Sequence, residues 1–237
     1  MPGADARRER AGRSELASGI SVLERLGILD FNGHMSVRLD DRHLLINSGG
    51  SVRSAITASD FVVVTMDGGF DDAAAPPPKE LPLHLAVYAA RPDVHCVLHG
   101  HPNWSTLLSC AGHGYKVTVA QGALLGDVAQ FPSPRSINND VSANEMAAVL
   151  GDGRAAMLKA HGSVVVGGDV VETAVLAIYM ELNAKRQVRL AAMGADYEFT
   201  AEEAAACRKG LNKRGLFEKC WQYYLAKFGL ADAGPAI

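Results

Sequence analysis

The stretch Asp93-Val94-His95-Cys96-Val97-Leu98-His99-Gly100-His101 decides how this chain is interpreted. Its residues mostly favour β-structure, and histidines stand at positions 99 and 101. In a strand, residues two apart point to the same face, so both imidazoles are expected on one side of a sheet. Imidazole is a common metal ligand, and catalytic metal sites usually take three protein ligands. The pair therefore suggests two of three metal ligands, although paired histidines at a strand end are also ordinary polar residues.

The composition favours a globular protein with one domain. The chain has 237 residues, of which 48% are hydrophobic and 21% are charged, which suffices for a full core. The formal net charge is -3 at pH 7, and because phosphate binding needs a clustered basic face, we expect no nucleic-acid partner. The only basic cluster is at Arg7, Arg8, Arg10 and Arg13, and no apolar segment follows it. We expect residues 1–13 to form a disordered basic arm, not a signal peptide or membrane anchor.

The cysteine pattern favours a reducing compartment. Cys96, Cys110, Cys207 and Cys220 show neither CxxC pairing nor the density of a disulfide framework. We therefore expect a cytoplasmic protein that has no membrane partner.

The pattern of apolar, glycine and proline residues predicts one α/β domain over residues 14–237, with a helical extension from about residue 194. Before the histidine stretch we expect helices over 14–26 and 79–90 and strands over 33–39, 43–48 and 61–66. After it we expect strands over 116–120, 155–159 and 164–166 and helices over 140–150, 169–193 and 200–228. Asp169 with Glu172, and Thr200 with Glu203, have the spacing of helix N-caps. The order lacks the βαβ alternation and GxGxxG fingerprint of a doubly wound sheet.

Two further motifs offer a third metal ligand and an acid–base group. His161 follows another expected strand, and Gly162 leaves room beside its imidazole. Glu80 opens the helix that carries His84 one turn later on the same face. Because a helix amino terminus stabilises the carboxylate anion, catalysis by Glu80 at neutral pH would need a pocket that raises its pKa. The alternatives are that Glu80 is an ordinary helix-start acid and that His84 is simply buried and hydrogen-bonded; we favour a supporting role for His84.

Several motifs occur in the order typical of one family. They are Gly33-His34-Met35-Ser36-Val37-Arg38, Ile46-Asn47-Ser48-Gly49, Thr57 to Asp60, Glu80 with His84 and Tyr88, Arg91-Pro92-Asp93-Val94, His99-Gly100-His101, and His161-Gly162. Over about residues 14–193, the chain thereby resembles the class II aldolase and adducin family. The resemblance implies a central mixed or antiparallel β-sheet flanked by helices.

The resemblance also implies a metal site. Family enzymes bind one divalent ion per subunit through three histidines, which match His99, His101 and His161 here, and their acid–base glutamate matches Glu80. Imidazole suits several metals, so zinc, manganese, iron and cobalt all stay open. A homo-oligomer, usually a tetramer with sites near subunit interfaces, is implied as well.

Two segments depart from the sugar-phosphate aldolases of this family. Those aldolases have Asn where this chain has His34, and a Ser pair where it has Pro78-Lys79, and these groups bind the substrate phosphate. Their replacement weakens the sugar-phosphate interpretation, although Ser48 and Gly49 remain as candidate substrate contacts. An aldolase tyrosine from the neighbouring subunit also has no convincing equivalent between residues 117 and 131.

The departures favour a carboxylate substrate. Lys79 and Arg38 could each bind a carboxylate, Lys79 as a point charge and Arg38 as a bidentate fork. The alternatives are an exposed loop charge for Lys79 and a structural strand residue for Arg38.

The segment from His34 to Arg38 most resembles the family branch that includes decarboxylases of hydroxylated aromatic or pyridine dicarboxylates and related β-keto acids. The resemblance implies a lyase of aromatic compound catabolism that removes CO₂ from a small carboxylate through a metal-stabilised enolate. Glu80, and after it His34, is the candidate for the proton transfer.

Other functions stay open. One is a class II aldolase, or a dehydratase of the same fold, for a hydroxy-keto acid or sugar phosphate. A non-catalytic adducin-like module is disfavoured because the histidine set is present. An iron-dependent oxygenase that uses the three histidines is a further alternative.

Overall fold

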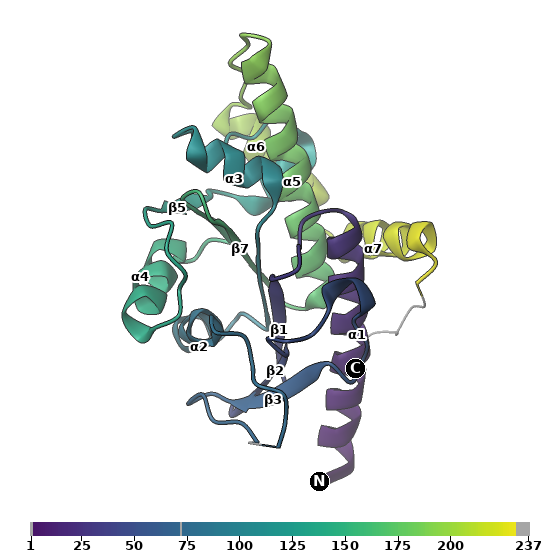
Figure 1. Cartoon of the computed structure of the whole chain (residues 1–237). Helices are drawn as coiled ribbons and strands as arrows, with labels where there is room; N and C mark the ends of the chain where they lie inside the picture. Colours follow the sequence, from purple (N-terminus) through teal and green to yellow (C-terminus); the bar gives the residue numbers. More distant parts are fainter. Residues whose placement is uncertain (1, 72, 231–237) are drawn as a thin grey trace.

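One sheet organises the molecule (Figure 1). The computed structural model describes residues 2–71 and 73–230, with side chains from residue 6. Within these residues, seven strands pair in the order β3-β2-β1-β4-β7-β6-β5. They are β1 (His34–Arg38), β2 (His43–Asn47), β3 (Phe61–Thr65), β4 (Cys96–Gly100), β5 (Ala129–Phe131), β6 (Ala155–Leu158) and β7 (Gly162–Gly167). Neighbouring strands are antiparallel except β5 and β6, which are parallel. The expected single α/β domain with a mixed or antiparallel central sheet is confirmed, and the sheet is mixed.

Helices cover both faces of this sheet. They are α1 (Pro2–Arg25), α2 (Leu81–Ala90), α3 (Asn103–Cys110), α4 (Asp140–Leu150), α5 (Val170–Ala192), α6 (Ala201–Leu211) and α7 (Arg214–Phe228), with short 3₁₀ helices at Arg53–Ala55 and Ala120–Leu125. One core cluster joins the sheet to α1, α5 and α7, and a second joins it to α2 and α4. In Figure 1, α2 and α4 accordingly lie on the opposite side of the strands from α1 and α5.

The alternation of side chains along β1 and β4 places the polar residues of these strands under α2. Met35 and Leu98 belong to the core that packs on α1 and α5. His34 and Ser36 alternate with Met35 and therefore point to the α2 side, where both contact His84 of that helix. Since His34 pairs with His99 in the sheet register, the two imidazoles stand side by side at one end of the central strands.

The amino-terminal residues differ from the sequence-based expectation. We expected residues 1–13 to be a disordered basic arm, but residues 2–13 are part of α1, and residue 1 lies outside the described part of the chain. Backbone carbonyls bind the arginines of this helix: Arg8 donates to Leu39 O at 2.7 Å and Arg13 to Phe61 O at 2.6 Å. The basic residues thus tie α1 to the sheet.

The segment before the second 3₁₀ helix also differs. We expected a strand over 116–120, but the structure has none there. The backbone N–H groups of Lys116 and Thr118 donate instead to the side-chain oxygens of Gln187 and Asn183 on α5. Those amides take the place of a strand partner, and the sheet edge is formed by β5, whose three residues the sequence did not reveal.

Both expected helix caps are present. Asp169 accepts from Glu172 N at 2.8 Å, and Thr200 and Glu203 form a reciprocal capping box. Among the helices of the described chain, no helix has the length and apolar character needed to cross a membrane.

Candidate active site

Three histidines and one glutamate converge at the end of the central strands. His99 belongs to β4, His101 follows it, His161 precedes β7, and Glu80 precedes α2. One ligand atom from each of these four side chains lies within 4.8 Å of the others. The ring centroids of the histidines are 5.0 to 5.2 Å apart. The structure therefore brings together the three expected metal ligands and the expected acid–base residue.

Hydrogen bonds orient two of the three imidazoles as metal ligands require, while Nδ1 of His161 is buried without a partner among the described residues. His99 Nδ1 lies 3.0 Å from Ser163 O, a position in which it donates, so the lone pair stays on Nε2. His101 Nδ1 likewise faces the Asp30 carboxylate at 3.1 Å, the arrangement that commonly orients a metal-bound histidine. Nε2 of His99 is buried without a hydrogen-bond partner among the described residues, which fits a nitrogen that binds a metal ion.

Close packing at Gly162 supports this arrangement. A Cβ atom on Gly162 would lie 2.1 Å from Gly100 O and 3.2 Å from the His101 ring. Such a contact is impossible without moving the backbone between the metal-site histidines. The expectation that Gly162 leaves room in the site therefore agrees with the geometry.

Glu80 points into the cluster and does not cap its helix. It occupies the N-cap position of α2 but makes no side-chain capping bond. Its Oε1 accepts from Ser136 Oγ at 2.9 Å and Ile137 N at 2.8 Å. Its Oε2 lies 3.3 Å from both His34 Nε2 and His99 Nε2. The alternative of an ordinary helix-start acid does not describe this side chain.

The structure does not raise the pKa of Glu80, the condition that we attached to catalysis by this residue at neutral pH. Burial alone would raise the pKa of this carboxyl group, but its contacts with His34 and His99 outweigh burial and lower the pKa well below the usual range. Glu80 is therefore a carboxylate at neutral pH, and it begins any proton transfer as an acceptor.

A buried hydrogen-bonded chain holds His34 against Glu80. His34 Nδ1 lies 2.7 Å from His84 Nε2, His84 Nδ1 lies 2.7 Å from Ser36 Oγ, and Ser36 Oγ lies 2.8 Å from Tyr88 OH. Burial lowers the pKa of His34 to about 4 and that of His84 well below its usual value, so both rings are neutral at pH 7. With an anionic Glu80 as acceptor, His34 carries its proton on Nε2 and receives a hydrogen bond from His84 on Nδ1. His84 thus has the supporting position that we favoured.

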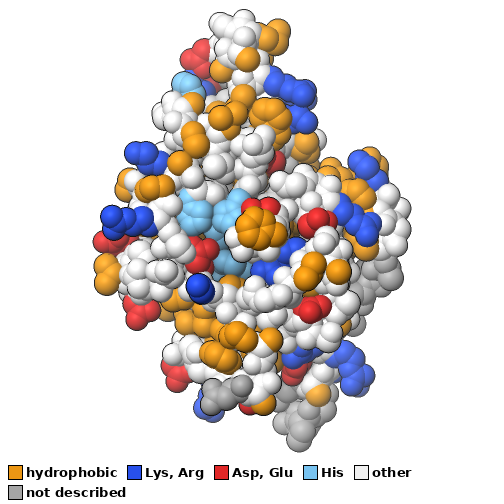
Figure 2. Space-filling view, viewed as in Figure 1, with side chains coloured by type: hydrophobic (Ala, Val, Ile, Leu, Met, Phe, Trp, Pro, Cys, Tyr) orange, Lys and Arg blue, Asp and Glu red, His pale blue; other side chains and the backbone are white. Residues whose placement is uncertain are grey.

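The cluster opens into a cavity of about 580 Å³, large enough for a small organic ligand. Its wall includes the expected residues His34, Gly49, Lys79 and Glu80. Ser48 is buried directly before Gly49 and is not part of the wall. Figure 2 shows histidine side chains gathered near the centre of the displayed face, beside acidic and basic side chains.

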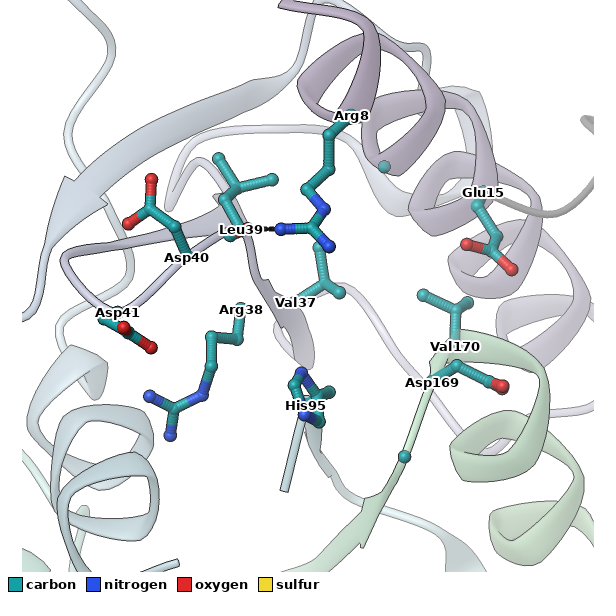
Figure 3. A pocket seen from close by; sticks show the side chains of 12 residues that line it. Arg8, Glu15, Val37, Arg38, Leu39, Asp40, Asp41, His95, Asp169 and Val170 are labelled. Atoms are coloured by element: carbon teal, nitrogen blue, oxygen red, sulfur yellow. Dashed lines mark hydrogen bonds between the residues drawn. The ribbon is translucent and has the colours of Figure 1, made fainter. Parts of the chain in front are cut away.

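Arg38 lies elsewhere, and its expected role as a substrate contact is corrected. Its guanidinium donates to Val94 O at 3.2 Å and Tyr88 O at 2.8 Å and stacks on the Tyr88 ring at 4.8 Å. It lines a separate cavity of about 270 Å³. Figure 3 shows it there together with Arg8 and His95. His34 and Arg38 are the first and last residues of β1, which separates them by roughly 13 Å at about 3.3 Å per residue. These contacts support the alternative that Arg38 is a structural strand residue.

Three residues of the site were not found from the sequence. Asp30 and Ser136 reach the cluster from loops, and no spacing in the sequence connects them to the histidines. Arg53 lines the same cavity. The sequence does set Arg53 apart. Between Arg42 and Asp60, only His43 and Arg53 have ionisable side chains.

Comparisons with known proteins identify the family of this chain. Residues 14–188 match the model of the class II aldolase and adducin N-terminal domain. The chain is 32% identical to 3,4-dihydroxyphthalate decarboxylase of Terrabacter sp. (strain DBF63), with 92% of this chain and 98% of that protein covered. It is 27% identical to the enzyme of the same name from Arthrobacter keyseri, with 92% and 94% covered.

A solved structure supports the fold. L-fuculose 1-phosphate aldolase from Glaciozyma antarctica PI12 superposes with a TM-score of 0.80 at 23% identity, covering 93% of this chain and 91% of that chain. At that identity the likeness concerns the fold alone. The family match over residues 14–188 carries the assignment: this chain belongs to the class II aldolase and adducin N-terminal domain family.

Proposed function

We propose that this protein is a divalent-metal-dependent decarboxylase of a hydroxylated aromatic carboxylate of the dihydroxyphthalate type. Support comes from the similarity to two 3,4-dihydroxyphthalate decarboxylases along 92% of the chain. The observation that carries the proposal is the cavity whose wall includes Glu80, His101 and His161 beside the cationic side chain of Lys79, with His99 buried next to it in the same cluster. Such a cavity suits an anionic substrate next to a group that can move a proton.

The reaction makes clear demands on the site. Decarboxylation replaces a C–CO₂⁻ bond by a C–H bond, so one proton must reach the ring carbon while CO₂ leaves. The carboxylate form of Glu80 can take the proton of the neighbouring substrate hydroxyl and return it to that carbon. When CO₂ departs, the electron pair of the broken bond restores the aromatic ring as a phenolate, which takes a proton from water.

The neighbouring residues support this proton transfer. The Nε2–H of His34 points at Oε2 of Glu80 and can donate a hydrogen bond either to that oxygen or to a substrate oxygen. Ser136 and Ile137 fix Oε1, so Glu80 approaches the substrate with Oε2. A divalent ion held by His99, His101 and His161 would supply a Lewis acid for the substrate oxygens where negative charge accumulates. The metal itself stays open among zinc, manganese, iron and cobalt.

The proposal extends to the subunit number, the cellular location and the metabolic role of the enzyme. Related class II aldolases are often oligomeric, and we propose a cytoplasmic homotetramer that acts in the catabolism of aromatic compounds.

The test is the release of CO₂ from a labelled substrate. We expect the metal-loaded protein to convert 3,4-dihydroxyphthalate labelled with ¹³C in its carboxyl groups to a dihydroxybenzoate and one equivalent of ¹³CO₂, followed by NMR. L-fuculose 1-phosphate serves as the aldol-cleavage comparison in the same preparation. Aldehyde formation from the sugar phosphate without CO₂ release from hydroxylated aromatic acids would overturn the proposal in favour of an aldolase.

A further inference from the structure

Arg53 is a buried cation in the wall of the active-site cavity. Its side chain belongs to the 3₁₀ helix Arg53–Ala55 and is only 3% exposed. Arg53 is one of the residues that line the cavity containing Glu80 and His161, and its charge helps lower the pKa of His34, for which burial is the main cause. Arg53 therefore lies within electrostatic reach of whatever the cavity binds.

The hydrogen bonds of Arg53 all go to uncharged oxygens. Its Nε donates to Gly33 O at 2.6 Å, and its Nη2 donates to Asn32 O at 3.1 Å. Its Nη1 donates to the carbonyl and hydroxyl oxygens of Ser51. Because Nη2 carries two hydrogens and Asn32 accepts only one, one N–H group has no acceptor among the described residues.

The positive charge of Arg53 has no carboxylate partner of its own. Among the described residues, none forms an ion pair with it within 4 Å, although Asp30 and Asp60 act on it from further away. Both carboxylates are engaged elsewhere, Asp30 with His101 and Asp60 with Thr57. A buried charge without a counterion is costly unless a ligand neutralises it.

We propose that Arg53 binds the carboxylate that the substrate keeps, so that the site selects aromatic diacids with neighbouring carboxylates over monoacids. This inference rests on the proposed function and narrows its substrate class. One carboxylate then lies beside Glu80 and the histidines and leaves as CO₂. The other accepts a hydrogen bond from the N–H group of Arg53 that has no other acceptor. This contact fixes the orientation of the aromatic ring and so determines which carboxylate is lost.

The test measures binding, and it does not need turnover. Phthalate and benzoate lack the hydroxyl groups of the proposed substrate and differ by one carboxylate, so calorimetry on the metal-loaded protein gives a Kd for each. We expect phthalate to bind at least roughly 10-fold more tightly than benzoate, as a hydrogen bond to a charged group implies. The variant Arg53→Gln should weaken phthalate binding by roughly 10- to 100-fold and leave benzoate within about 2-fold.

Arg38→Gln is the matched control. It also removes an arginine bound by backbone carbonyls, but in the other cavity. The ratio of the phthalate and benzoate Kd values should not change in this variant. If Arg53 were only a brace for the loops at Asn32 and Ser51, Arg53→Gln would weaken both ligands equally, and that result would overturn the inference.

Two further arms keep the test decisive. Should Arg53→Gln fail to fold, the wild-type comparison still decides, because equal Kd values for phthalate and benzoate contradict the inference. Arg53→Lys keeps the charge and should retain part of the preference. A phthalate preference without CO₂ release would refute the proposed function and still support carboxylate binding by Arg53. CO₂ release without a phthalate preference would support the proposed function and refute carboxylate binding by Arg53.

Discussion

His99→Ala is expected to abolish stoichiometric metal binding and to lower CO₂ release by roughly a thousandfold or more, since a Lewis acid contributes several kcal/mol and each 1.4 kcal/mol is a factor of ten. The side chain is fully buried, and its Nε2 makes no hydrogen bond with any of the described residues. Alanine leaves only His101, His161 and Glu80 around the position. Metal per subunit, measured by mass spectrometry, and CO₂ release are the two readouts.

His95→Ala is the control on the same stretch of chain. His95 is exposed and lies in the second cavity, so its removal should leave metal content and activity unchanged. A His99→Ala protein that still held one metal per subunit would show that the ligand set is wrong.

Glu80→Gln should lower kcat by roughly 10²- to 10⁴-fold, the usual contribution of general acid–base catalysis, with the metal content preserved. The amide oxygen can still accept from Ser136 and Ile137, so the side chain stays in place, but it can no longer carry a proton. Separate measurements of kcat and of metal per subunit distinguish this role from that of the histidines.

Glu145→Gln makes the same substitution at an exposed site on α4 and should have no effect. Unchanged kcat in Glu80→Gln would remove Glu80 from the proton transfer. Loss of metal in that variant would instead make Glu80 an essential ligand.

The core of the site was predictable because local periodicity determines it. The spacing of His99 and His101 in a β-forming stretch placed two imidazoles together, and the position of His161 after the strand expected over 155–159 added the third. The order of family motifs identified Glu80. Each of these residues lies at the end of a helix or strand, where the direction of the side chain follows from the sequence pattern.

The remaining parts depend on tertiary contacts. Arg38 shares the α2 side of β1 with His34 by alternation, but four residues of extended chain carry it out of the site. The pKa of Glu80 falls below its usual range because the imidazoles of His34 and His99, from two different strands, contact its carboxylate, and sequence spacing does not show these contacts. The prediction of a disordered arm was wrong because Arg8 and Arg13 are bound by backbone carbonyls that lie more than 30 residues away in the sequence.

Metal titration shows whether CO₂ release depends on the ion that His99, His101 and His161 would hold. Protein stripped with a chelator should show no CO₂ release from 3,4-dihydroxyphthalate, and activity should rise in proportion to added divalent metal until it levels off at one equivalent per subunit. Undiminished CO₂ release from the metal-free protein, or no release at any metal loading, would contradict a metal-dependent decarboxylase.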